Sequence, residues 1–219
     1  DGATLDFTLS SSEMNTTYTW TASTSNIDSS FVSSGTEANI NQTITLIDPM
    51  VSGSITFDIL PTANGCPGPI RRVTVIVNPV PVINSHTLDT TALCTGGALN
   101  IDVSGTPTGT VYNWVVINAV DAQVAGGVTS GSSTSGDISV VLEATNPTTA
   151  GTIQFEITPV RNGCTGNPVQ TAVVTVHPIP GTPIPTPIFE ICSGEPTNIS
   201  VNTSPMIAGT AIQWTVVNV

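Results

Sequence analysis

The chain has 219 residues, of which only 8% are charged, and three cations against 15 acids give it a net charge of −12. Such a surface repels nucleic acid and anionic membranes, because binding to either requires Lys and Arg to replace counterions. No apolar run approaches the roughly 18–20 residues that cross a bilayer. We therefore expect neither a nucleic-acid partner nor membrane insertion.

The hydrophobic residues predict β-structure throughout. Valine and isoleucine fall into short alternating runs bounded by Gly, Pro, Asn and Ser, a pattern typical of β-strands. No stretch has the spacing of a long amphipathic helix. The fold class is predicted to be all-β.

The first 80 residues contain an ordered set of signals. "DGATLDF" opens the chain, and "YTW", "SITFDILP", "NGCPGP" and a valine-rich run ending in Pro-x-Pro follow. Alternation in "SITFDILP" places Ile55, Phe57 and Ile59 on one inward face. The Asn-Gly of "NGCPGP" is expected to turn a hairpin into the valine-rich strand. The polar segment 23–39 is expected to be a surface loop that tolerates insertions.

Residues 84–180 repeat the same set. Gly2 to Trp20 and Gly96 to Trp114 are both 18 residues, and "NGCTGNP" recurs 98 residues after "NGCPGP". The polar segment 126–137 is again expected to be a surface loop. Six or seven short strands with one central tryptophan predict an immunoglobulin-like β-sandwich. The strands are expected near 87–92, 98–104, 110–117, 138–143, 151–158 and 170–177.

Residues 188–219 begin a third copy, with "CSGEPTNI" and "IQW". The first copy, 1–80, lacks the cysteine that the register places just before Asp1, so the chain is expected to be part of a longer tandem array. The linkers "NPVPVIN" and the proline-rich "HPIPGTPIPTP" favour extended geometry. The repeats are therefore expected to string out in a line, with neighbouring repeats as partners.

The four cysteines recur with the repeat. One kind, Cys94 and Cys192, precedes the second strand, and the other, Cys66 and Cys164, lies in the late hairpin. Spacings of 28, 70 and 28 residues do not suit a metal site. The repeat predicts a Cys94–Cys164 disulfide, worth roughly 4 kcal/mol in the entropy model and implying an oxidising compartment. Cys66 and Cys192 are then unpaired in this fragment, a Cys66–Cys192 bridge being the alternative.

The aromatic residues have two readings. Trp20, Trp114 and Trp214 keep nearly the same distance from the start of each copy. The strands of Trp114 and Trp214 continue with "VVI" and "TVV", which together with the constant distance predicts core tryptophans, packed with Phe57 and Phe155. The alternative is a set of sugar-stacking platforms.

No catalytic pattern emerges from the remaining polar residues. His86 and His177 have no Ser-His-Asp companions. Asp58 and Glu156 are equivalent, but each stands alone on an outward face, whereas glycoside hydrolysis needs a carboxylate pair. Calcium between domains is an alternative that no D-x-D-x-D-G loop supports. We expect no enzyme activity, no cofactor and no metal.

The ordered motif C-x-G…(Y/I)-x-W…P-x3-G-(S/T)-I-x-F-(D/E)-I…N-G-C-x-G…V-x-V-x-P-x-P covers the whole chain. It resembles the PKD-like and immunoglobulin-like repeats of giant Bacteroidota surface proteins, including gliding-type adhesins and other cargo of type IX secretion. The resemblance implies secretion to the cell surface and a stalk or adhesive role, with surface polysaccharide as a possible contact. The alternative function is a set of carbohydrate-binding or spacer modules on a secreted polysaccharide-degrading enzyme.

Overall fold

A computed structural model describes residues 2–182, 190–196 and 199–215. Its regular structure is β-sheet apart from one 3-10 turn, η1 (Ala125–Gly127), which confirms the all-β prediction. The chain divides into two compact units. The first comprises 1–85, 104–111 and 158–167, and the second comprises 86–103, 112–157 and 168–219.

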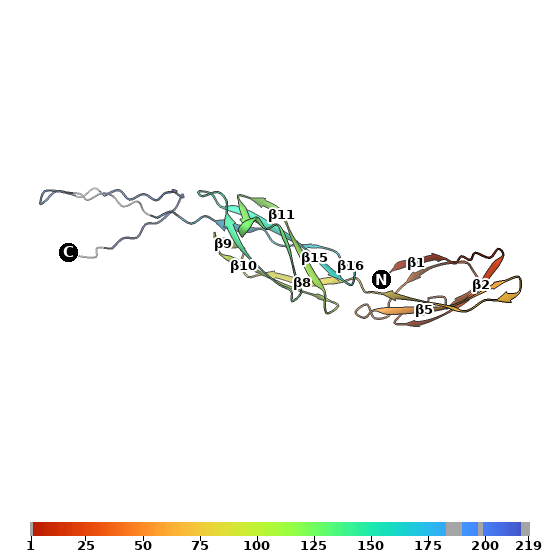
Figure 1. The fold of residues 1–219 in the computed structure, drawn as a ribbon. Coiled ribbons are helices and arrows are strands. Elements are labelled where there is room, and N and C mark those ends of the chain that lie inside the picture. Colours follow the sequence, from red (N-terminus) through yellow and green to blue (C-terminus); the bar gives the residue numbers. More distant parts are fainter. Residues whose placement is uncertain (1, 183–189, 197–198, 216–219) are drawn as a thin grey trace. The chain divides into compact units, whose positions relative to one another are not determined.

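The first sandwich has two sheets (Figure 1). In one, β1 pairs with β4; in the other the order is β3-β2-β5-β6, with β7 also paired to β5. The long β5 is the central strand of the second sheet, because it pairs with every residue of β2 on one side and with every residue of β7 on the other. The strands are β1 (Ala3–Thr8), β2 (Thr16–Ser25), β3 (Ser34–Gly35), β4 (Asn39–Ile44), β5 (Gly53–Ala63), β6 (Cys66–Pro67) and β7 (Arg71–Val77).

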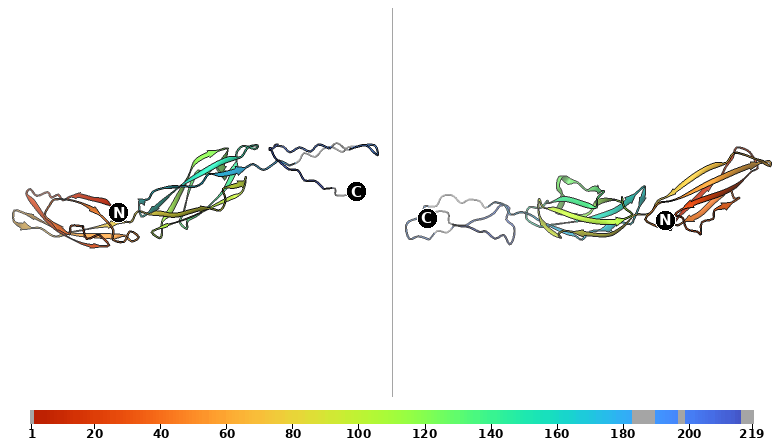
Figure 2. Two further views of the ribbon diagram at one scale, coloured as in Figure 1. Left: turned by 180° about the vertical axis from the view of Figure 1, so that it is seen from behind. Right: turned by 90° about the horizontal axis from the view of Figure 1, so that it is seen from below.

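The second sandwich repeats this plan with more strands, and Figure 2 shows both sandwiches from two further directions. One sheet has the order β12-β14-β10-β8, and the other has the order β13-β11-β15-β18-β9, with β16 and β17 also paired to β15. The strands are β8 (Val82–Leu88), β9 (Ala92–Cys94), β10 (Ala98–Thr106), β11 (Val111–Val120), β12 (Ala122–Val124), β13 (Ser130–Ser133), β14 (Asp137–Ala144), β15 (Gly151–Arg161), β16 (Cys164–Thr165), β17 (Val169–Gln170) and β18 (Val174–His177).

The sequence register between the two copies has a structural counterpart. The amide of Gly2 donates to the carbonyl of Ile44 at 2.9 Å, and the amide of Gly96 donates to that of Leu142 at 2.8 Å. Strand β1 therefore corresponds to β10, and β4 corresponds to β14. These equivalences give the two copies the immunoglobulin-like sandwich that the sequence predicts.

The predicted single strand at 87–92 is wrong. The chain leaves β8, which belongs to one sheet, and enters β9, which pairs in parallel with β18 in the other sheet. Asp89 stabilises the crossing, since its carboxylate accepts hydrogen bonds from the amide and the side-chain Nδ2 of Asn100. Those hydrogen bonds, the side-chain bond first, lower the pKa of Asp89 below its ordinary value.

Both Asn-Gly pairs turn hairpins, as predicted. Asn64 and Gly65 have φ of 51° and 79°, and Asn162 and Gly163 have φ of 48° and 80°. Positive φ at both central residues is the requirement of a type I′ turn, whose twist suits the flanking strands. The turns connect β5 to β6 and β15 to β16, so the valine-rich strand begins a few residues later.

Residues 190–196 and 199–215 contain no named strand. The proposed third copy is thus described only in part, and residues 183–187 of the proline-rich linker lie outside the described residues.

Candidate functional site

The tryptophans of the first two copies occupy the centres of the two cores. Trp20 on β2 is 4% exposed and Trp114 on β11 is 8% exposed. Each ring packs edge-on against a phenylalanine of the long central strand, Phe57 at 5.7 Å and Phe155 at 5.8 Å between centroids. Both phenylalanines are fully buried. In this position neither indole can serve as a stacking platform for a sugar.

A glycine lies under each of these indoles. Gly35 on β3 pairs with Trp20, and Gly131 on β13 pairs with Trp114. A Cβ atom at Gly131 would lie 2.6 Å from Cζ2 of Trp114, and one at Gly35 would lie 2.5 Å from Cζ2 of Trp20. The segments 23–39 and 126–137, expected to be free surface loops, therefore include strands that close over the tryptophans.

The sequence signal for these glycines was present but weak. Both segments are rich in Gly and Ser, which is typical of loops. Only the alignment of the two copies distinguishes a glycine needed for close packing from one that turns a loop. Phe31, in the first of these segments, joins the core as well, in edge contact with Phe57 at 6.2 Å.

The predicted Cys94–Cys164 disulfide is absent, because all four cysteines are free thiols. Cys164 pairs with Arg161 at one end of β15, whereas Cys94 pairs with His177, one residue beyond the pairing of Val176 with Gly151 at the other end. Figure 1 shows β9 and β16 at opposite ends of the second sandwich. An 11-residue strand is about 35 Å long, and a disulfide needs Cα atoms within about 7 Å.

The remaining two cysteines are exposed. Cys66 occupies in the first sandwich the position of Cys164, since it pairs with Ala63 at the end of β5. Cys192 lies in the described segment 190–196. The alternative bridge between Cys66 and Cys192 is not formed either, because both are free thiols.

The clearest electrostatic feature is a cross-strand ion pair. Asp58 and Arg72 lie directly opposite each other on β5 and β7, and the guanidinium donates from Nε and Nη2 to the carboxylate at 2.7 and 2.9 Å. The hydrogen bond from Arg72 is the main cause that lowers the pKa of Asp58. In the second copy Glu156 and Gln170 take these places. Asp58 is thus paired with Arg72 instead of standing alone.

The histidines do not meet other catalytic groups. His86 lies half-buried on β8, and His177 is the exposed last residue of β18. Among the described residues, no three His, Cys, Asp or Glu side chains come together in a way that could hold a metal ion. Among the described residues, hydrogen bonds lower the pKa values of Asp28, Asp58 and Asp89, and burial raises the pKa of Tyr112.

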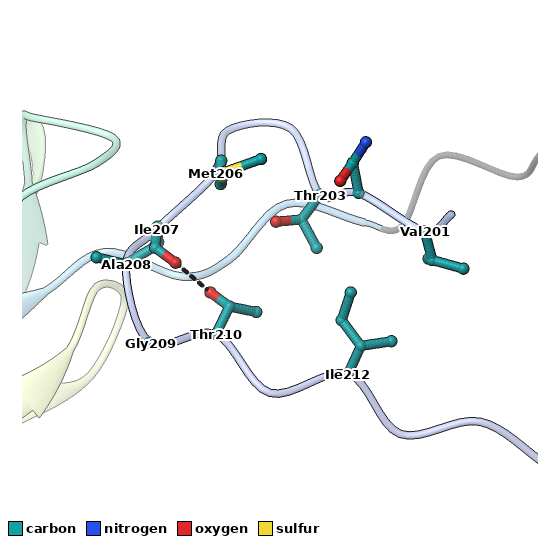
Figure 3. A pocket seen from close by; sticks show the side chains of 9 residues that line it. Val201, Thr203, Met206, Ile207, Ala208, Gly209, Thr210 and Ile212 are labelled. Atoms are coloured by element: carbon teal, nitrogen blue, oxygen red, sulfur yellow. Dashed lines mark hydrogen bonds between the residues drawn. The ribbon is translucent and has the colours of Figure 1, made fainter. Parts of the chain in front are cut away.

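One open apolar cleft lies in the C-terminal segment (Figure 3). It is bordered by a turn that a 2.8 Å hydrogen bond from the Thr210 hydroxyl to the carbonyl of Ile207 closes. Its lining includes Val201, Met206 and Ile212, all exposed. The predicted core placement of Trp214 is wrong here, because 79% of this side chain is exposed.

The reason for the exposure of Trp214 follows from the other copies. Trp20 and Trp114 are covered by Phe57 and Phe155, which come from the later half of each repeat. Residues 190–196 and 199–215 contain no strand equivalent to β5 or β15, so among the described residues the indole has no central strand to pack against.

The fold and these sites define tandem immunoglobulin-like β-sandwiches that bury Trp20 and Trp114 in their cores. Comparison with known families gives the class a name: residues 1–81 and 91–180 each match the PKD-like domain. The chain belongs to the PKD-like domain family. Domains of this family are generally non-catalytic and are typically extracellular or at the cell surface.

The solved structures that the chain matches are only distantly similar to it. The D0–D1 domain of intimin shares 13% identity over 80% of this chain and 89% of that chain, with a TM-score of 0.28. A chimeric titin Z1Z2 tandem carrying a GRGDS peptide from fibronectin shares 11% identity over 81% of this chain and 92% of that chain, with a TM-score of 0.27. No curated protein matches the sequence. Among the described residues, no helix is long and apolar enough to cross a membrane.

Proposed function

We propose that this chain is a non-catalytic section of a long extracellular surface adhesin or filament of Bacteroidota, exported by type IX secretion. The observation that supports this proposal most is that the same sandwich occurs twice in succession, since the PKD-like domain matches residues 1–81 and 91–180. The first two copies bury their tryptophan and central phenylalanine, so these recurring aromatic positions serve packing. The role of the repeats would be to hold other parts of the protein away from the cell and to contact surfaces.

Two experiments test this proposal: the location of the protein on cells, and the effect of its loss on attachment. Antibodies raised against residues 1–182 should label intact, non-permeabilised cells, and protease treatment of those cells should remove the label. Deletion of the gene should reduce attachment to a surface without changing growth on soluble nutrients. Label seen only after permeabilisation would contradict the proposal.

A second function is favoured by one observation, the exposed indole of Trp214. An exposed tryptophan suits stacking on a sugar ring, so the chain would be a carbohydrate-binding or spacer part of a secreted polysaccharide-degrading enzyme. Pull-down of the 219-residue chain on insoluble polysaccharides tests this. Binding that Trp214→Ala abolishes, and that Trp114→Ala affects only through stability, would favour it over the adhesin.

A further inference from the structure

The two kinds of cysteine lie at opposite ends of the second sandwich. The hairpin cysteines, Cys66 and Cys164, pair with the last turn-side residues of the central strands, Ala63 and Arg161. The leading cysteine Cys94 lies about 35 Å from Cys164, at the other end of β15. Pairing within one repeat is therefore geometrically excluded, although the repeat carries two cysteines in a fixed pattern.

The path of the chain relates these ends to the neighbouring repeats. The second sandwich starts with β8, whose Ser85 hydroxyl lies 2.7 Å from that of Ser104, near the end of β10. The loop that follows β10 reaches the hairpin end, because Gly109 lies beside Arg161. The last strand, β18, finishes at His177 beside Cys94. The chain thus enters at the end with the hairpin cysteine and leaves at the end with the leading cysteine.

The first sandwich follows the same path. Its last strand, β7, finishes at Val77, which pairs with Gly53 at the end of β5 opposite Cys66. The amide of Gly2 bonds to Ile44, as that of Gly96 bonds to Leu142, so the start of β1 corresponds to the residues just after Cys94. A cysteine before Asp1 would take the place that Cys94 takes in the second copy.

A short linker joins the leading end of one repeat to the hairpin end of the next. Only residues 78–81 separate β7 from β8, and five peptide steps span at most about 18 Å. Within the first unit the sulfur of Cys164 lies 3.9 Å from the carbonyl oxygen of Asn78, the residue directly after β7. The hairpin thiol therefore lies beside the start of the linker, and the leading position of the preceding repeat belongs to that same end, where β7 finishes.

We propose that the disulfides of this array join successive repeats, the leading cysteine of one repeat bonding to the hairpin cysteine of the next. Cys164 takes the leading cysteine of the repeat before it, and Cys94 takes the hairpin cysteine of the repeat after it. The inference rests on the tandem array of the proposed function. Two thiols form one S–S bond and lose two protons and two electrons to a disulfide oxidant, such as oxidised glutathione, which becomes two molecules of glutathione.

Such bonds would have a different mechanical role from an internal bridge. An internal bridge limits how far one sandwich extends when it unfolds, whereas a bond across each linker restricts bending between repeats. The same two cysteines per repeat are sufficient, since each repeat uses one thiol at each end.

The test uses the 219-residue chain with one cysteine added immediately before Asp1. The chain is oxidised in a glutathione buffer, and its linkages are mapped by non-reducing peptic digestion and mass spectrometry. The expected product links the added cysteine to Cys164. Two matched variants carry Cys164→Ser or Cys66→Ser; the first should leave the added cysteine unlinked, and the second should leave the product unchanged.

A link from the added cysteine to Cys66, or free thiols at both the added cysteine and Cys164, would overturn the proposal. Circular dichroism of each variant checks that the sandwiches are folded. This outcome is independent of where the protein resides: the linkage can form in vitro even if intact cells show no label, and labelled cells with no such linkage would leave the adhesin proposal standing alone.

Discussion

At the scale of single residues, the tryptophans differ in burial, and this difference predicts how much each one contributes to stability. Trp114 is 8% exposed against Phe155, whereas Trp214 is 79% exposed. Trp114→Ala should lower the free energy of unfolding of its sandwich by about 3–5 kcal/mol, the range for deleting a large core aromatic residue. Trp214→Ala should change it by no more than about 0.5 kcal/mol. Urea unfolding followed by circular dichroism measures both, and equal effects would refute these placements.

The glycine beneath the indole gives a second prediction. Gly131→Ala introduces a methyl group 2.6 Å from the ring of Trp114, so the ring or β13 must move. We expect a loss of about 1–3 kcal/mol, typical of overpacking a core. Ser132→Ala is the matched control, since Ser132 is the next residue on β13 and is exposed. If both variants melt at the same temperature as the wild type, β13 does not close over the tryptophan.

At the scale of elements, the paired strands β5 and β7 give a pH-dependent prediction. Arg72 lowers the pKa of Asp58 below its ordinary 3.8, so the pair stabilises the fold above that value and loses its effect as the pH falls through the lowered pKa. Arg72→Gln should raise the pKa of Asp58 toward 3.8 and lower stability at neutral pH, but should have little effect at a pH below the lowered pKa of Asp58. Because both side chains are solvent-exposed, the difference should shrink in high salt.

The matched control is Arg71→Gln, which removes the same charge from the neighbouring residue. Arg71 faces Ile59 across the strands and makes no ion pair with Asp58. NMR titration of the Asp58 carboxyl carbon should show a much larger shift for the Arg72 variant. Equal shifts in the two variants would mean that net charge, and not the specific contact, controls Asp58.

The strands also show which features a sequence can predict. Alternation in "SITFDILP" and "TIQFEITP" correctly predicts β5 and β15, since a strand with one buried face repeats every two residues. The crossing at Asp89 was missed because nothing in the sequence of residues 82–94 signals that the chain changes sheets between β8 and β9. The cysteine pairing was wrong for a related reason: the repeat gives the position of each thiol along the chain, but the end of the sandwich that it occupies depends on the pairing of β9 with β18.

At the scale of the whole molecule, the two sandwiches have separate cores. Tyr18, Trp20 and Phe57 belong to one cluster formed by residues of the first sandwich, and Trp114 packs with Phe155 of the second. Separate cores lead us to expect that each sandwich unfolds as its own cooperative unit. Scanning calorimetry of the 219-residue chain should therefore resolve two transitions.

Single core substitutions should assign these transitions. Trp20→Ala should lower the melting temperature of one transition and Trp114→Ala that of the other, because each substitution removes a buried side chain from one core only. A core deletion of about 3–5 kcal/mol shifts the melting temperature of a domain of this size by well over 10 °C, so the assignment should be unambiguous. A single transition that both substitutions lower equally would show that the sandwiches unfold as one unit. In that case each repeat would depend on its neighbour, and the inter-repeat bond would add to an existing coupling.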